Sequence, residues 1–310
     1  MKLHNYSIYP VMYHYVHSRS INNLNFHKIK INEFKNQINF FKKNYNILGY
    51  EDFVEILKTK KIPKKASILL TFDDGYKDHI ENVFSILKKN NLKGFFYPPT
   101  DIFKEKLLDV SKIQLILSKK PDVKKLIKFT KDYFGINFEK KILKDQLIEK
   151  SKYDNGDITL FKRLYQYAIP NKDKKIPLNI LFNKIVNDSE KSLAKKLYLN
   201  KKDLLTLSKN NMHIGIHGNS HYWWSKISNK EQMKEILGAK KYFKKLGIDA
   251  SSVCYPFGGY NKDTIKILKK YNFSFSLTTK KGIINKKNIV NKFIINRYDT
   301  NDFKGIKNNT

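Results

Sequence analysis

The sequence predicts an α/β protein built on a parallel sheet or barrel. Short apolar runs of strand length, such as "ILLTFDD" (68–74) and "KGFFYPP" (93–99), alternate with amphipathic stretches of helical period. Strands that are separated by helices in this way pair in parallel. A chain of 310 residues, of which 41% are hydrophobic, is long enough for a barrel with an insertion.

The first hundred residues supply the elements of this alternation. A strand is expected first, in "SIYPVMYHYV", because it is rich in Tyr and Val. Helices are expected where apolar residues recur every three to four positions, and the helix after "FDDG" carries one apolar stripe. The expected elements are a strand at 7–16, helices at 32–45 and 50–61, a strand at 67–72, a helix at 76–91 and a strand at 93–99.

The middle of the chain interrupts the pattern. Residues 101–200 contain amphipathic helical stretches with few strand signals between them, so we expect a helical insertion within one domain that spans 1–310. Alternation then resumes to the end of the chain. The expected elements are strands at 212–218, 251–259, 273–279 and 292–300 and helices at 229–247 and 261–272.

The formal net charge of +33 raises the question of nucleic-acid binding. The basic residues are almost all lysine, since only Arg19, Arg163 and Arg297 are arginine, and they are spread along the chain. Nucleic-acid modules usually use arginine for bidentate contacts. We therefore expect a solvated basic surface and no specific nucleic-acid partner, while contact with anionic membrane surfaces or anionic sugar carriers stays open.

Cysteine content and hydropathy bear on location. Cys254 is the only cysteine, which excludes a disulfide framework within the chain. The N-terminal stretch is interrupted by His, Asn, Tyr and Pro and has no continuous apolar core of a signal peptide. No stretch approaches the roughly 20 apolar residues of a spanning helix. The sequence thus predicts a cytoplasmic protein without a transmembrane segment, and it does not fix the oligomeric state.

Two clusters of polar residues follow predicted strands. Asp73 and Asp74 end the strand 67–72, where two adjacent carboxylates repel each other unless a cation is near. His217 and His221 follow the strand-like "HIGI" at a spacing that lets two imidazoles converge. Two histidines and one carboxylate can hold a divalent metal, and the second carboxylate can take a proton from its bound water. Each motif alone is more often a turn or a surface pair.

These motifs resemble a known family. "TFDDGY" (71–76), "HGNSH" (217–221) and "YPFGGYN" (255–261) are similar to the motifs of the polysaccharide deacetylases, which are also called carbohydrate esterase family 4 or NodB-homology deacetylases. The resemblance covers about two thirds of the chain. It implies a distorted (β/α) barrel and a metal-dependent hydrolase, commonly with zinc, that removes acyl groups from amino sugars.

The resemblance also implies roles for individual residues. Asp73 corresponds to the catalytic base, and the backbone N–H of Phe257 corresponds to the oxyanion donor. The implied metal ligands are Asp74, His217 and His221.

The chain departs from the family pattern at two points. Cys254 stands where many members have an arginine that orients the base, and no histidine follows His221 to act as the general acid. Arg297, after an apolar strand, is the candidate to replace the arginine, although a surface or structural ion pair is an alternative. His14, at the end of the first predicted strand, is the candidate acid, with a half-buried structural histidine as the alternative.

Aromatic residues near the motifs are candidates for binding the substrate. Tyr222 and Trp223 follow the second histidine, and aromatic rings stack on the C–H faces of sugars. Tyr97 ends a predicted strand and Tyr255 lies in the third motif, so both could line the same mouth. Packing in the barrel wall is the alternative for these aromatic residues.

The prediction from sequence is a metal-dependent hydrolase that removes an N-acyl group, such as acetyl, from an amino sugar. Its partner would be a carbohydrate, and an N-acylated sugar on a carrier in surface-glycan synthesis fits a cytoplasmic protein. The alternative is a barrel that has lost catalysis and binds glycans or lipid-linked sugars. The two departures from the family pattern support this alternative. A charge-driven nucleic-acid protein is the third hypothesis.

Overall fold

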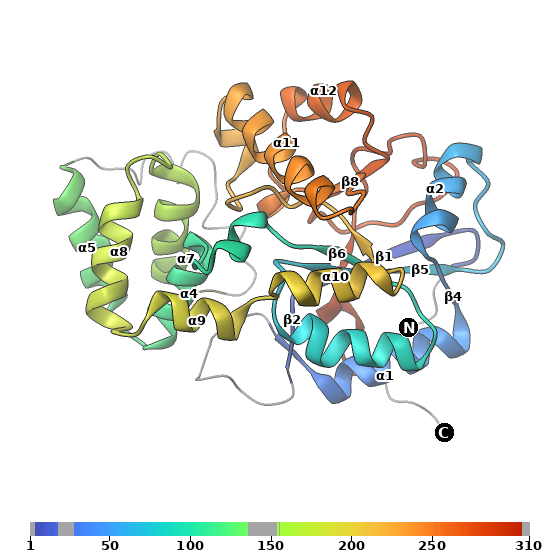
Figure 1. Ribbon diagram of the computed structural model, residues 1–310, viewed down its shortest axis with the longest axis horizontal. Helices are drawn as coiled ribbons and strands as arrows, with labels where there is room; N and C mark the ends of the chain where they lie inside the picture. The colour runs from blue at the N-terminus through green and yellow to red at the C-terminus, as the bar shows by residue number, and fades with distance from the viewer. Residues whose placement is uncertain (1–3, 18–27, 136–153, 155, 306–310) are drawn as a thin grey trace.

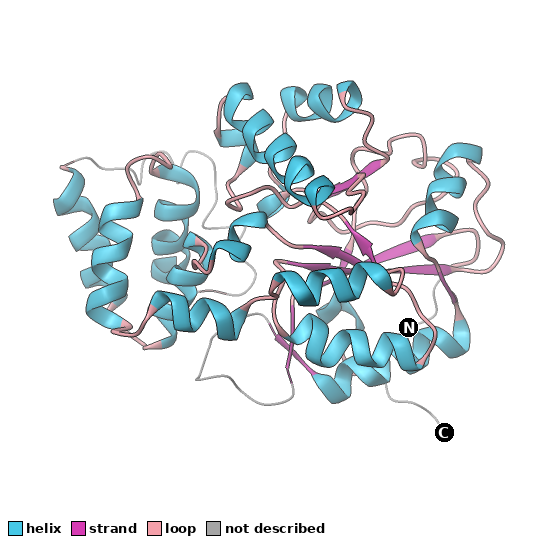
Figure 2. Cartoon of the chain, viewed as in Figure 1, coloured by secondary structure: helices cyan, strands magenta, loops and turns pink. Residues whose placement is uncertain are grey.

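The computed structural model describes residues 4–17, 28–135, 154 and 156–305. Figure 1 shows a strand-containing part and, beside it, a bundle of helices from the middle of the chain. Figure 2 shows that the strands gather in the first part, with helices packed around them.

The strands form a distorted barrel. The main sheet has the order β10–β1–β5–β6–β7, all in parallel, and β8 pairs with β9. Single parallel bridges join Ile216 to Val253 and Leu277 to Ile295, which link the two sheets into a ring. The strands are β1 (Ile8–Tyr13), β2 (Tyr15–His17), β3 (Lys28–Lys30), β4 (Asn46–Ile47), β5 (Ser67–Asp73), β6 (Phe95–Tyr97), β7 (His213–Ile214), β8 (Ser252–Cys254), β9 (Phe275–Leu277) and β10 (Tyr298–Asp299).

Helices cover the barrel and fill the middle of the chain. In Figure 1, α1 and α10 lie on one side of the strands and α11 and α12 on the other. None of the helices in the described part of the chain combines the length and apolarity that a bilayer crossing requires. The α-helices are α1 (Ile31–Asn44), α2 (Tyr50–Thr59), α3 (Ser85–Lys89), α4 (Asp109–Ser118), α5 (Val123–Phe134), α7 (Gly156–Arg163), α8 (Lys175–Ile185), α9 (Glu190–Leu197), α10 (Lys201–Lys209), α11 (Asn229–Lys245) and α12 (Lys262–Lys270). Short π-helical or 3₁₀ turns are η1 (His79–Phe84), η2 (Thr100–Lys104), η3 (Leu164–Ala168), η4 (Trp224–Lys226), η5 (Pro256–Gly258) and η6 (Thr300–Phe303).

The structure differs from the predicted elements mainly at their ends. The strand expected at 7–16 is divided into β1 and β2, because the chain leaves the ladder at His14. The strand expected at 292–300 is reduced to β10 and a single bridge at Ile295. Helices α8 and α10 and the short strands β3 and β4 were not predicted. In α8, Pro177 and scattered lysines obscure the apolar stripe.

Alternation along the strands separates two apolar layers. In β5, Ile68, Leu70 and Phe72 belong to one cluster, which includes core-facing residues of α1, α10, α11 and α12. Leu69 belongs to a second cluster with side chains from β1, β6, β8 and β9, which fill the barrel interior. Since side chains alternate along a strand, Thr71 and Asp73 continue the interior row of Leu69.

A third apolar cluster lies in the helical bundle. It contains side chains of α4, α5, α7, α8 and α9, and it reaches the barrel side of the molecule through Tyr15 and Tyr76. Tyr76 stacks on Tyr198, with ring centroids 6.1 Å apart. The helices of residues 101–200 therefore have a core of their own, and whether they form an insertion that folds with one barrel domain stays a prediction.

The interior of the barrel predicts the effect of one substitution. A Cβ at Gly215 would overlap the ring of Tyr97 and lie 2.7 Å from Ser252 Oγ. We expect Gly215→Ala to lower the free energy of unfolding by about 1–3 kcal/mol, because the packed interior cannot make room. Denaturant unfolding measures this change. The control is Gly156→Ala, where a Cβ meets no described atom within 4 Å. Equal losses in the two variants would contradict the packing argument.

Candidate active site

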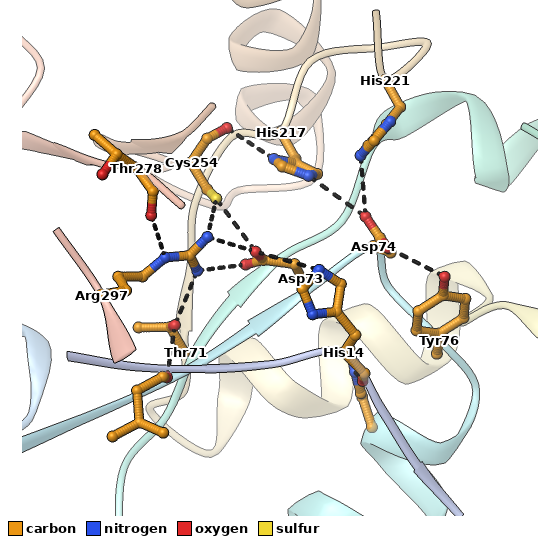
Figure 3. Close-up of polar contacts among 12 residues, drawn as sticks. His14, Thr71, Asp73, Asp74, Tyr76, His217, His221, Cys254, Thr278 and Arg297 are labelled. Carbon is orange, nitrogen blue, oxygen red and sulfur yellow. Dashed lines mark hydrogen bonds and ion pairs between the residues drawn. The ribbon is translucent and has the colours of Figure 1, made fainter. Parts of the chain in front are cut away.

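Asp73 lies at the rim of the barrel, at the point where the interior row of β5 ends. Its side chain is 2% exposed, so its charge needs a partner. Arg297 provides one: Nη1 donates to Asp73 Oδ1 at 3.0 Å and Nη2 donates to Oδ2 at 2.7 Å (Figure 3). Burial raises the pKa of Asp73, but the attraction and hydrogen bonds of Arg297 outweigh it, so the pKa lies below its usual value.

The guanidinium of Arg297 is itself fixed by neutral neighbours. Its Nε donates to the carbonyl of Thr278 at 2.8 Å, and Nη1 donates to Thr71 Oγ1 at 3.0 Å. Cys254 Sγ lies 3.1 Å from Nη2 and 3.4 Å from Asp73 Oδ2. Because the guanidinium has several fixed contacts, it holds the Asp73 carboxylate in one orientation.

Asp74, His217 and His221 meet beside Asp73. Asp74 Oδ1 lies 3.4 Å from His217 Nε2 and 3.2 Å from His221 Nε2, and one potential ligand atom from each residue lies within 4.8 Å of the others. Figure 3 shows both imidazoles on the same side of Asp74. Tyr76 donates from its hydroxyl to the other carboxylate oxygen, Oδ2, at 3.1 Å.

The protonation of His217 tests whether these residues fit a metal. Its Nδ1 lies 2.7 Å from the carbonyl of Cys254, which can only accept a hydrogen bond, so Nδ1 carries the proton. Nε2 therefore faces Asp74 Oδ1, a buried atom that has no hydrogen-bond partner among the described residues. Burial lowers the pKa of His217, but Cys254 and the nearby acids outweigh it, so the pKa lies well above its usual value and a second proton can stand between Nε2 and Oδ1. A metal ion can take the place of this proton, since both atoms then direct a lone pair toward one cation. The donor set thus fits a divalent cation such as zinc.

A second group of potential ligands lies nearby but fits a cation less well. Asp73, His217 and Cys254 also bring ligand atoms within 4.8 Å of one another. Arg297 already donates to Asp73 and contacts the sulfur of Cys254. A metal ion there would face a fixed positive charge, which disfavours this group.

Three residues of the site have a left-handed backbone conformation, which sets the direction of the loops. Asp74, His221 and Phe257 have φ values of 70°, 57° and 56°, which cost energy for residues other than glycine. Buried Glu235 of α11 holds the loop between the two histidines, because its Oε2 accepts from the backbone N–H groups of Asn219 and Ser220 at 2.9 Å each. No motif in the sequence points to Glu235, which lies on the core-facing side of its helix.

His14 faces Asp73 from the end of β1. Its Nε2 lies 4.0 Å from Asp73 Oδ2, and its side chain is 34% exposed. A buried histidine fixes the backbone at His14, since His79 Nε2 lies 2.6 Å from the carbonyl oxygen of His14. Burial lowers the pKa of His79 to about 4, so this histidine is neutral and donates to the carbonyl.

Phe257 packs against the second imidazole of the site. Its ring packs edge-on against His221, with centroids 4.5 Å apart, and stacks on Trp223 at 5.1 Å. The residue lines the same cavity as Asp73 and Asp74. Phe257 is thus close to the proposed metal ligands, as an oxyanion donor must be. Its role as that donor stays a prediction.

A cavity of about 270 Å³ opens in front of these residues. Of the four aromatic candidates for substrate binding, only Tyr255 lines it, and its hydroxyl is bonded to Ser276. Tyr97 is completely buried and bonded to Ser252, because it belongs to the interior row of β6. Tyr222 and Trp223 line neighbouring hollows.

The helical bundle contributes residues to the cavity that were not predicted as site residues. The cavity is also lined by Val110 and Gln114 of α4, by Asp154, by Lys162 and Arg163 of α7, and by Gln166 of η3. Periodicity places these residues on helices, but it does not say how the helices pack on the barrel. Tyr76, in contrast, directly follows the acidic pair and could have been found from its position.

Solved structures with this fold include several deacetylases. The deacetylase PplD of Streptococcus pyogenes, in complex with acetate, has a TM-score of 0.59 at 19% identity, with 95% of this chain and 92% of that chain covered. IcaB from Ammonifex degensii has a TM-score of 0.56 at 14% identity, with 96% and 93% covered. A de-N-acetylase from Aggregatibacter actinomycetemcomitans gives 0.55 at 14%, with 95% of each chain covered. The fold is that of the NodB-type deacetylases.

Sequence comparison identifies the family. A family model described as polysaccharide deacetylase matches residues 60–126 and 177–276, which is more than half of the chain. The chain therefore belongs to the polysaccharide deacetylase family, whose members hydrolyse amide bonds. YxkH of Bacillus subtilis (strain 168), named as a polysaccharide deacetylase, is 25% identical over 93 residues, which is 30% of this chain and 33% of YxkH.

The ion pair at the rim predicts a large effect on stability. Arg297→Gln leaves a buried carboxylate without its partner and should lower the free energy of unfolding at pH 7 by about 3–5 kcal/mol. Adding Asp73→Asn should restore part of this loss, with a coupling energy of about 0.5–3 kcal/mol in a double-mutant cycle. Because the pKa of Asp73 is lower in the folded state, the coupling should be present above pH ~4 and decline as the pH falls further.

The matched control is the exposed pair of Lys281 and Asp302, whose atoms are 2.7 Å apart. Removing either partner there should cost no more than about 1 kcal/mol, because water screens the pair. A coupling energy near zero between Asp73 and Arg297 would contradict the assigned pairing.

Proposed function

We propose that the protein is a metal-dependent deacetylase that removes an N-acyl group, acetyl in the simplest case, from an amino sugar of a glycan or its precursor. One observation carries the proposal: a carboxylate and two imidazole nitrogens converge within 4.8 Å beside a second carboxylate that an arginine orients. Family membership and the deacetylases among the similar structures support the same activity.

Asp74, His217 and His221 would hold the metal ion, most simply zinc. Such an ion, when bound, polarises the acyl carbonyl and lowers the pKa of a water ligand toward ~7. The Nδ1–H bond of His217 to the carbonyl of Cys254 fixes the imidazole for this task. The hydroxyl of Tyr76 occupies Oδ2 of Asp74 and leaves Oδ1 for the ion.

Asp73 would accept the proton of the attacking water, because Arg297 keeps it ionised and correctly turned. The backbone N–H of Phe257 would stabilise the oxyanion, and His14 would protonate the departing amine. The position of His14 at 4.0 Å from Asp73 supports this role, since the proton taken from water can then reach the leaving group across a short distance.

The alternative is a barrel that binds glycans without turning them over. This alternative rested on the two departures from the family pattern, which are Cys254 in place of the arginine that orients the base and the lack of a histidine after His221. Arg297 contacts Asp73 from the position directly before β10, and His14 faces Asp73 from the position directly after β1, so both gaps have a candidate replacement. This arrangement supports catalysis over binding alone. The cytoplasmic location, the link to surface-glycan synthesis and a carrier-linked substrate remain predictions.

Metal content and turnover test the proposed function together. The parent protein should contain about one zinc ion per chain and release free amine from N-acetylated sugars. Asp74→Asn should lose both the metal and the activity. Asp73→Asn should keep the metal and lose about 10²–10⁴-fold in kcat, because only the base is removed. Metal is measured by plasma mass spectrometry, and amine release by a fluorogenic assay. A folded parent with stoichiometric zinc and no amine release would favour the binding barrel.

The role of His14 has a separate test. His14→Gln should lower kcat on an N-acetyl sugar by about 10²-fold or more and leave the metal content unchanged, because the amine departs without a proton donor. An activated acetyl ester, whose leaving group needs no proton, should be hydrolysed at nearly the parent rate. The control is His4→Gln, which changes an exposed histidine. Equal losses on both substrates would assign His14 a structural role instead.

A further inference from the structure

The active-site cavity has a second wall that the proposed chemistry does not use. One wall is the barrel rim with the acidic and imidazole residues, and the other consists of side chains from α4, α7 and η3. The family model leaves out residues 127–176, which include α7 and η3. Two of the three elements of the second wall thus lie outside the part of the chain that matches the family model, and its side chains are candidates for selecting the substrate.

Arg163 is the unusual residue of this wall. It is one of three arginines in a chain with 61 basic residues, and it lines the cavity in a half-buried position. Within the described part of the chain, its Nη1 donates to the neutral Gln166 Oε1 at 2.9 Å, and its buried Nε has no hydrogen-bond partner. The guanidinium therefore lines the cavity without a hydrogen bond to a described acidic residue.

The ring of Trp223 holds this guanidinium in place. Arg163 Cζ lies 5.3 Å from the Trp223 ring, which also stacks on Phe257. Arg163 is thereby connected through one aromatic ring to the loop of the proposed oxyanion donor.

The other charged groups that line the cavity are occupied. Asp73 is paired with Arg297, and Asp74 faces the two imidazoles. Lys162 donates to Asp154 at 2.7 Å, and Asp299 accepts from the backbone of Asn301 at 2.8 Å and caps η6. Arg163 is the cation of this wall for which the described residues supply no ion pair. Burial lowers the pKa of its guanidinium, and the attraction of Asp154 only partly opposes this.

A second unpartnered atom lies on the same wall. Gln114 Oε1 of α4 is buried and has no hydrogen-bond partner among the described residues. An amide oxygen accepts from a hydroxyl, and a guanidinium donates in a fixed fork to a carboxylate or a phosphate. The wall therefore offers an acceptor for a sugar hydroxyl and a donor pair for an anion.

We propose that Arg163 selects N-acylated sugars that carry an anionic group, a phosphate or a carboxylate, next to the acylated amine. The inference rests on the proposed deacetylase function and specifies its substrate class. The cavity volume of about 270 Å³ supports recognition within a single sugar unit, since ligand pockets commonly measure roughly 300–1,000 Å³. Gln114 would accept a hydrogen bond from a hydroxyl of the same sugar.

Three acetylated sugars of similar size test the proposal. They are N-acetylglucosamine 1-phosphate, N-acetylmuramic acid with its carboxylate, and the neutral methyl N-acetylglucosaminide. The parent should show a kcat/KM at least about tenfold higher for one of the anionic sugars than for the neutral one. The better of the two anionic sugars distinguishes phosphate from carboxylate. Arg163→Gln should remove this preference, mainly through a higher KM for the anionic sugar.

Two further variants separate selection from structure. Arg163→Lys keeps the charge but loses the fork, so it should retain only part of the preference. Lys184→Gln removes an exposed charge from α8 and should leave the preference intact. Equal losses on neutral and anionic sugars in Arg163→Gln, or an equal change of preference in Lys184→Gln, would overturn the proposal.

Binding of the deacetylated sugars gives a readout that does not need catalysis. Calorimetry with glucosamine 1-phosphate, muramic acid and methyl glucosaminide should show tighter binding of an anionic sugar to the parent, lost in Arg163→Gln. If the parent binds with this preference but releases no amine, the deacetylase function fails and the recognition stands. If the parent deacetylates the sugars but binds all three equally, the selection by Arg163 is wrong.

Discussion

The pairing of Asp73 with Arg297 is the constraint on which the rest of the site depends. Alternation along β5 directs Asp73 into the barrel, where a carboxylate is costly without a cation. Arg297 reaches it from the position directly before β10, so segments 224 residues apart in the sequence must come together before the charge is satisfied. This contact also fixes the carboxylate at the point where the ligand residues begin.

The neighbouring groups then follow from the geometry of the rim. Asp74 leaves the strand in a left-handed conformation, which turns its carboxylate away from Asp73 and toward His217 and His221. Two acids in succession are thereby given two different surroundings: a guanidinium for one and imidazoles for the other. Neighbouring groups of the same type can perform different tasks when their surroundings differ in this way.

The sequence predicted the parallel fold and the convergence of the acids with the two histidines, because carboxyl ends of parallel strands meet at one rim. The rarity of arginine pointed to Arg297. The inward orientation of Tyr97 was missed because it depends on the register of β6 between its neighbours. Arg163 and Gln114 were missed because their place follows from how the helices pack against the barrel, and no single helix records that in its own periodicity.

The separate apolar cluster of the helical bundle has an evolutionary consequence. Its side chains pack mostly against one another, and Tyr76 and Tyr198 are among the contacts that tie it to the barrel. Mutations in the helices of the bundle can thus reshape one wall of the cavity without replacing any residue of the catalytic rim. Lineages descended from such a chain could acquire new preferences by drift in the bundle alone, with the reaction centre inherited unchanged.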